Sequence, residues 1–126
     1  MSYSNPNRRT FPFGPIDFGT GADIETSIKG PKGKKGTLVD IVVTAIEVFT
    51  DGGKVNIGTG ADPVAYASLN IGTLAATDTL TASDGTDPDA ILDANLPADQ
   101  IEVVFVKTGG TPTGQAYVSI VVDYAD

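Results

Sequence analysis

The segment Gln115–Tyr124, QAYVSIVVDY, alternates between apolar and more polar residues, and it constrains the fold more than any other part of the chain. In an extended strand, successive side chains point to opposite faces of the sheet. One face would carry Ala116, Val118, Ile120, Val122 and Tyr124, and the other Gln115, Tyr117, Ser119 and Asp123. The alternation therefore predicts a β-strand that lays one face against a core.

Further β-strand signals occur along the rest of the chain. The segment 38–50, LVDIVVTAIEVFT, is rich in Val, Ile and Thr and precedes an Asp-Gly-Gly turn at 51–53, after which the chain resumes as KVNIG. Because Asp-Gly readily supplies the positive φ angles of a tight turn, this pattern predicts a β-hairpin. The segment 101–107, IEVVFVK, is predicted to form a second hairpin with 115–124 through the Gly- and Pro-containing loop 108–114.

Many short strands separated by turn signals predict an all-β fold, an antiparallel β-sandwich or jelly roll. At most one short helix is expected, at 87–96 (DPDAILDANL), with Asp87 as its N-cap and Pro88 as its first residue. A chain of 126 residues is long enough to bury one core without metals or disulfides, so we expect a single domain over residues 19–126.

Residues 1–18 differ from the rest of the chain and predict an extended N-terminal arm. Three prolines favour extended or polyproline conformation there. Four of the nine aromatic side chains also lie in this segment: Tyr3, Phe11, Phe13 and Phe18. A solvated tail should be poor in aromatic residues, so we expect the arm to dock, and a neighbouring subunit is favoured over the chain's own body. On this interpretation, deletion of residues 1–18 would leave the body folded.

Basic residues gather near the start of the chain, although the protein carries a net charge of −8. Residues 1–35 hold six basic and three acidic side chains, a net +3, whereas residues 36–126 carry a net −11. The six basic residues are Arg8, Arg9, Lys29, Lys32, Lys34 and Lys35. The glycine-spaced lysines have two interpretations: a solvated turn between two strands, or a basic edge that meets an acidic protein surface.

The residues that the chain lacks disfavour several activities. It has no His and no Cys, which removes the commonest general bases, nucleophiles and zinc ligands, so we expect no enzymatic activity and no cofactor or metal. The lysine loop does not match a P-loop, and the net negative charge argues against nucleic acid as a partner. No secretory signal and no apolar run long enough to cross a bilayer are seen, which predicts a soluble protein made in the cytoplasm.

Two weaker hypotheses concern the binding of calcium and the binding of a sugar. The acidic run 84–93 lacks the ligand spacing of an EF-hand calcium loop. Tyr66 and Tyr117 would suit stacking on a sugar if both are exposed, although packing within the sheet is the commoner role of such residues.

Two long stretches resemble small structural proteins of tailed-phage virions. They are VVTAIEVFTDGGKVNIGTGADPVAYASLNIGT and IEVVFVKTGGTPTGQAYVSIVVDYAD, within residues 38–126. The shared features are a Thr/Val strand, an Asp-Gly turn, a V-x-I-G strand followed by GADP, and a final GG-x-P-x-G-x-A-x-V segment. The chain looks most like capsid decoration (cement) proteins, which have jelly-roll-like bodies on the capsid exterior, often as trimers.

The resemblance implies a virion structural protein that is made in the host cytoplasm, binds the major capsid protein and stabilises the shell, as a homotrimer. Residues 1–18 are not covered by the likeness. Combined with the charge pattern, it gives a predicted set of partner-binding residues: Tyr3, Arg8, Arg9, Phe11, Phe13, Phe18, Lys29, Lys32, Lys34 and Lys35. The alternative is a virion adhesin or fibre-base module that binds glycans on the host surface, because lectins share the β-sandwich architecture.

Overall fold

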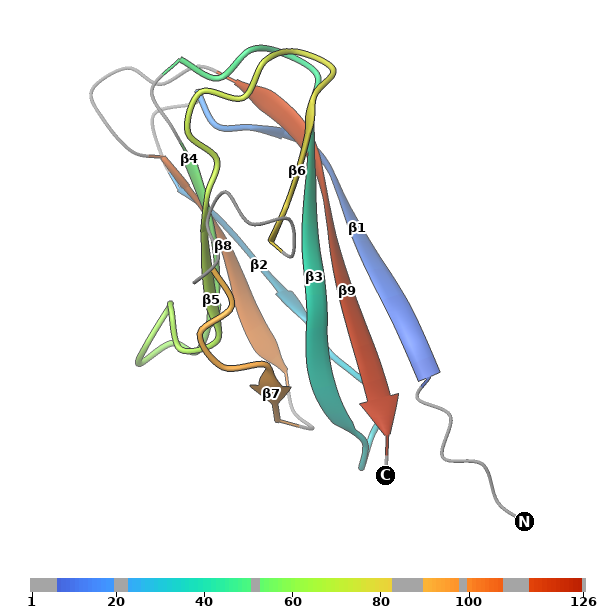
Figure 1. The fold of residues 1–126 in the computed structure, drawn as a ribbon. Coiled ribbons are helices and arrows are strands. Elements are labelled where there is room, and N and C mark those ends of the chain that lie inside the picture. Colours follow the sequence, from blue (N-terminus) through green and yellow to red (C-terminus); the bar gives the residue numbers. More distant parts are fainter. Residues whose placement is uncertain are drawn as a thin grey trace.

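The computed structural model of the chain describes residues 7–19, 23–50, 53–82, 90–97, 100–107 and 114–125. Its strands form two antiparallel sheets that face each other as a sandwich, which confirms the predicted fold class (Figure 1). The strands are β1 (Asn7–Asp17), β2 (Ile24–Ile28), β3 (Lys35–Ala45), β4 (Gly53–Gly58), β5 (Ala67–Asn70), β6 (Thr79–Thr81), β7 (Asn95–Leu96), β8 (Ile101–Lys107) and β9 (Gln115–Ala125).

The order of the strands is that of a jelly roll. The first sheet has the order β1-β9-β3-β6, with the short β7 also paired to β3, and the second sheet has the order β2-β8-β4-β5. Nested antiparallel pairs underlie this order: β4 with β5, β3 with β6, β2 with β8, and β1 with β9. The chain is thus a two-stranded ribbon folded over a core, and the pairing of β9 with β3 and of β8 with β4 closes the sheets.

The two predicted hairpins are wrong for the same reason. β3 ends at Ala45 in the first sheet and β4 begins at Gly53 in the second, so the chain crosses between sheets where a tight turn was expected. β8 and β9 also lie in opposite sheets. Each of these strands has a buried apolar face, and two such faces can cover each other when the connection passes over the end of the core. The turn residues 51–52 and 108–113 lie outside the described residues.

The core lies between the sheets and is built from the inward side chains of the strands. In β9 the predicted alternation is confirmed, because its inward residues are at most 4% exposed. The largest side chains that are almost fully buried are Phe18, Phe49, Phe105, Ile41, Ile57, Leu69 and Ile120, with Val43, Val55, Val103, Val118 and Val122. Three of the phenylalanines meet edge to face: the ring centroid of Phe18 lies 5.3 Å from that of Phe49 and 6.0 Å from that of Phe105.

From Asn7 onward, the segment predicted to be an arm belongs to the protein's own sheet. β1 is the edge strand of the first sheet, and nine of its residues have Cα partners in β9. The expected boundary at residue 18 is therefore absent from the described part of this segment, and β9 of the same chain supplies the pairing that a neighbouring subunit was expected to provide. An edge strand tolerates Pro12 and Pro15 because the N–H groups on its outer side need no partner in the sheet.

The predicted helix at 87–96 is not formed over its described residues, 90–96. Backbone groups there bond to neighbouring strands: the Ala90 carbonyl accepts from the Ser68 N–H (2.8 Å), and the Ala94 carbonyl accepts from the Leu38 N–H (2.7 Å). Ala90 and Leu96 are buried against the core, so tertiary packing overrides the capping signal. Residues 87–89 lie outside the described residues. In the described part of the chain, no helix has the length and apolar character needed to span a membrane.

Candidate functional site

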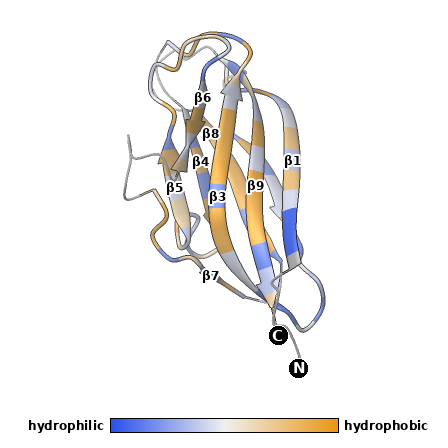
Figure 2. Cartoon of the chain, turned by 45° about the vertical axis from the view of Figure 1, so that its right-hand side comes forward, coloured by the Kyte–Doolittle hydropathy of each residue, from blue (hydrophilic) through white to orange (hydrophobic). Residues whose placement is uncertain are grey.

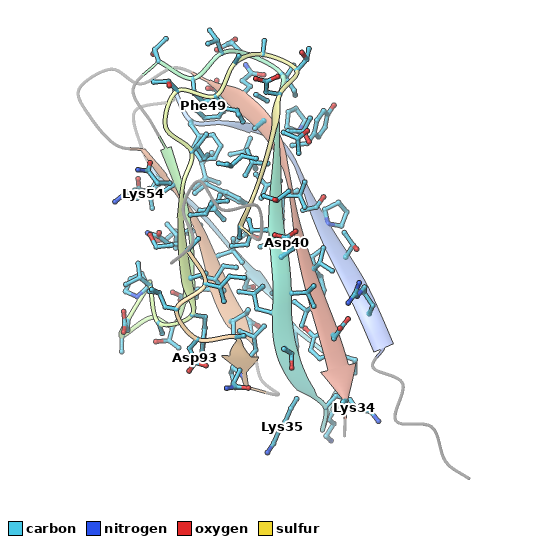
Figure 3. The ribbon with its side chains drawn as sticks, in the orientation of Figure 1. Lys34, Lys35, Asp40, Phe49, Lys54 and Asp93 are labelled. Atoms are coloured by element: carbon cyan, nitrogen blue, oxygen red, sulfur yellow. The ribbon has the colours of Figure 1, made fainter. Side chains whose placement is uncertain are left out.

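The loop between β2 and β3 carries the lysines and lies at the end of the sandwich where β9 ends. In the register of the first sheet, Lys35 lies opposite Ala125 and Gly36 lies opposite Tyr124. Within the loop, the Lys34 N–H donates a hydrogen bond to the Pro31 carbonyl (3.2 Å), which closes a turn. Figure 3 shows Lys34 and Lys35 at this end, near the tip of β9 and far from Phe49.

Tyr124 fixes the position of this loop. Tyr124 is 4% exposed, and its ring lies so close to Gly30 that a Cβ atom there would overlap the ring carbons Cε1 and Cζ. Only glycine fits at that approach without movement of the ring. Gly36 also faces the ring, because its added Cβ would lie 3.1 Å from Cε1. Two of the three glycines of the lysine segment thus have a physical cause, because Gly30 and Gly36 lie against an aromatic side chain from the last strand.

β1 brings Arg8 and Arg9 to the same end of the sandwich as the lysine loop. The guanidinium of Arg8 donates to the carboxylate of Asp123 twice, from Nε to Oδ1 (2.7 Å) and from Nη2 to Oδ2 (2.9 Å). These hydrogen bonds hold the pKa of Asp123 below its usual range. Arg9 lies opposite Val122 and is exposed, and its positive charge acts on Tyr124.

We call this set the basic corner: Arg8, Arg9, Lys29, Lys32, Lys34 and Lys35. All are exposed except Lys34, which is half-buried. The corner holds six of the eight basic side chains, of which Arg8 is paired with Asp123, and the remaining two basic and fifteen acidic side chains leave the rest of the chain at a net −13. An exposed cluster of one sign on a body of the other sign produces a strongly polarised field, which orients a charged partner during association.

The predicted aromatic binding residues lie elsewhere. Phe18 is 2% exposed and sits at the opposite end of the sandwich, beside Phe49. Phe11 and Phe13 are half-buried and pack against the core: Phe11 meets Tyr124 edge to face at 6.4 Å, and Phe13 meets Phe105 at 5.6 Å. These three rings therefore contribute to the protein's own core, and Tyr3 lies outside the described residues.

Asp123 and Tyr124 belong to the site although sequence reasoning did not place them there. Tyr124 was expected to be a core residue, which it is, but its contact with Gly30 depends on the pairing of β9 with β3. The predicted hairpin joins the β9 segment to the β8 segment instead. The ion pair between Arg8 and Asp123 could have been found only once β1 was placed beside β9.

The structure does not support the predicted sugar-stacking pair, and it describes little of the acidic run. Tyr66 is half-buried and packs against the core, next to the second sheet, whereas Tyr117 is 53% exposed on the first sheet. The two rings therefore do not form one platform for a sugar. The acidic run 84–93 lies mostly outside the described residues, and no group of three or more metal-ligating side chains occurs among those that the structure describes.

Comparison with known proteins leaves the family open. No family model matches the chain, and no curated protein matches it. A solved structure described as "Structure of infectious bursal disease virus Gx strain" is 12% identical over 96% of this chain, with a TM-score of 0.33. The match covers 37% of that protein's chain. A likeness this distant carries no argument about function.

The buried phenol of Tyr124 predicts a loss of stability at alkaline pH. Burial raises its pKa above the usual value, against a smaller opposing effect of Arg9. The unfolded chain then ionises at a lower pH than the folded one, so this contribution is intact below about pH 10 and falls as the pH rises from there towards the folded pKa.

Tyr124→Phe keeps the ring and removes the ionisation. Between about pH 8 and pH 11, we expect the wild-type protein to lose more unfolding free energy than this variant, measured by urea denaturation. Lysines that deprotonate in the same range are present in both proteins and cancel in the comparison. Equal losses in the two proteins would show that the Tyr124 hydroxyl ionises as freely as it does in the unfolded chain.

Proposed function

We propose that this protein is a structural component of a virion, a capsid decoration (cement) protein that binds the outside of a phage capsid through its basic corner. The observation that carries the proposal is the gathering of six basic side chains at one corner of an otherwise acidic sandwich. A partner that fits this corner carries a cluster of carboxylates, as an acidic patch on the major capsid protein would.

Three further features support this proposal. The jelly-roll topology is common among capsid proteins, and it also occurs in lectins and enzymes. The motifs of residues 38–126 resemble those of decoration proteins. The lysine loop is held in place by Tyr124, so its charges are presented without the cost of ordering a free loop on binding.

The experiment measures attachment to capsids purified from phage that lacks the gene for this protein. The test variant carries Lys29→Gln, Lys32→Gln and Lys35→Gln, three exposed residues of the basic corner. We expect capsid affinity to fall by about tenfold or more, with the wild-type affinity falling steeply as salt rises. Protein that cosediments with capsids is quantified across a titration at low and at physiological ionic strength.

A control separates the local charge from the total charge. The variant Thr73→Glu, Ala75→Glu, Ala76→Glu changes the net charge by the same −3, but at exposed positions of the β5–β6 connection, near Phe49 at the opposite end. It should bind capsids like the wild type. An equal loss of capsid affinity in both variants would show that net charge is the cause. Full binding by the lysine variant would refute the role of the basic corner.

A further inference from the structure

One small part of the surface that the described residues form carries no charge. On the outer side of the first sheet, β1, β9 and β3 place Pro12 beside Ser119 and Ser119 beside Val42, and the next row places Tyr117 beside Thr44. Ile46 continues this side of β3, and its N–H donates to the Gln115 carbonyl (2.8 Å). We call this the uncharged face: Pro12, Val42, Thr44, Ile46, Tyr117 and Ser119.

The uncharged face contains large exposed apolar side chains. Tyr117 is 53% exposed and Ile46 is 44% exposed. In Figure 2 the hydrophilic colouring of β1 and β9 is concentrated at the end near the chain termini, while the parts of these strands farther from that end are neutral to hydrophobic. Aromatic side chains are enriched and charged ones depleted at the centre of protein–protein contacts, and this face has both properties.

Acidic side chains occupy the surroundings. Asp40, Glu47 and Asp78 lie at the borders of the uncharged face on β3 and the loops beyond it, and the outer side of the second sheet carries exposed Glu25 and Glu102. A second copy of a chain with a net charge of −8 is repelled wherever two acidic surfaces meet. The uncharged face offers copies of this protein an approach that escapes this repulsion.

We propose that the uncharged face is a contact between copies of this chain that stand side by side on the capsid. This proposal rests on the proposed function. The strands of the first sheet run from the basic corner to the opposite end, so a molecule attached by that corner turns the uncharged face sideways, towards its neighbours (Figures 1 and 3). Two copies that meet there with parallel long axes keep both basic corners on the same side, and the assembly attaches through several corners at once.

The size of the face sets the strength of the contact. Strands are spaced about 4.8 Å apart and residues on one side of a strand about 6.8 Å apart, so these six residues cover a few hundred Å² at most. A stable interface buries about 800 Å² per partner. The isolated protein should therefore associate weakly and reversibly, and the contact becomes saturated only where the capsid holds copies next to each other.

The test is sedimentation equilibrium of the isolated full-length protein at concentrations up to about 1 mM, without capsids. Ser119→Glu places an acid at the centre of the uncharged face. Ser27→Glu, also an exchange of a strand serine, places one on the exposed outer side of β2, opposite Glu102. We expect the average mass of the wild type and of Ser27→Glu to rise with concentration. The association constant of Ser119→Glu should be at least about tenfold lower.

Thermal unfolding of both variants checks that each is folded. A wild type that stays monomeric at the highest concentration overturns the proposal, and so does a Ser119→Glu variant that associates like the wild type. Loss of association in both variants would also overturn it, since net charge would then be the cause. Because no capsid is present, the result is independent of the capsid-binding experiment with the lysine variants.

Discussion

Deletion of residues 1–18 is expected to unfold the protein. The deletion removes β1, and with it the nine residue pairs that β1 forms with β9. It also removes Phe18, which is worth roughly 1.5–3 kcal/mol when fully buried, and the half-buried Phe11, Phe13 and Ile16, which together contribute a similar amount. Together these side chains contribute about 3–6 kcal/mol, and the backbone pairing of β1 with β9 is lost as well, whereas a small domain is stable by only about 5–15 kcal/mol.

The measurement is circular dichroism of the purified deletion variant with a thermal melt, next to a control that lacks residues 1–6 only. The control stops short of β1 and should melt cooperatively. Exposed β9, with its apolar inner face and unpaired edge, should drive the larger deletion to aggregate. A cooperative melt of the larger deletion near the wild-type temperature would restore the interpretation of residues 1–18 as an arm outside the sandwich.

The strands of this protein could be predicted from its sequence better than their partners. Alternation in the β9 segment identified both its existence and its buried side, because one face of a strand must leave water. The same alternation says nothing about which strand lies beside it. An apolar strand that follows a Gly-rich connection can fold back in the same sheet or cross to the other, and the local turn signal is the same in both cases.

The N-terminal segment shows how a local signal can be outweighed. Its prolines are typical of an unpaired arm, yet an edge strand needs hydrogen bonds on one side only, so Pro12 is accommodated in β1. The helix signal at 87–96 failed in a similar way: Ala90 and Leu96 are buried, and the carbonyls of Ala90 and Ala94 accept hydrogen bonds from other strands. Burial of apolar residues decided both cases against local propensity.

The basic residues of the basic corner could be predicted from the sequence, but the aromatic residues around them could not. The charge asymmetry identified the six basic residues, and these are the residues that the fold brings together. The aromatic residues grouped with them belong to the core, because a strand sends alternate side chains to opposite faces and the same strand can supply both Arg8 and Phe11. The contact of Tyr124 with the lysine loop could not be predicted, since it depends on how β9 lies relative to the loop between β2 and β3.

Gly114→Ala is expected to be the most destabilising single substitution that we propose. Gly114 precedes β9, where the chain has crossed from the second sheet to the first, and it has a φ of +147°, which other residues rarely adopt. An added Cβ would lie 2.5–2.7 Å from three ring carbons of Phe49, which is 1% exposed. Backbone strain of about 1–3 kcal/mol and overpacking of about 1–3 kcal/mol together predict a loss of roughly 2–6 kcal/mol.

The loss is measured by urea denaturation, with Gly60→Ala as the matched control. A Cβ at Gly60 would meet only a carboxylate oxygen of Glu102 at 3.6 Å, and this substitution should change stability by no more than about 0.5 kcal/mol. If Gly114→Ala changes the free energy of unfolding no more than the control does, the Phe49 ring does not restrict the backbone at Gly114, where the chain enters β9.

A double-mutant cycle separates the two causes of the loss at Gly114. Phe49→Ala removes every ring carbon that the new methyl group would strike, but it leaves the backbone angle at residue 114 unchanged. If overpacking contributes, Gly114→Ala should cost about 1–3 kcal/mol less in the Phe49→Ala background than in the wild type. The cost that remains measures the backbone strain. Strictly additive effects would assign the whole loss to strain, and the contact between Phe49 and Gly114 would then play no part in fixing where the ribbon bends over the core.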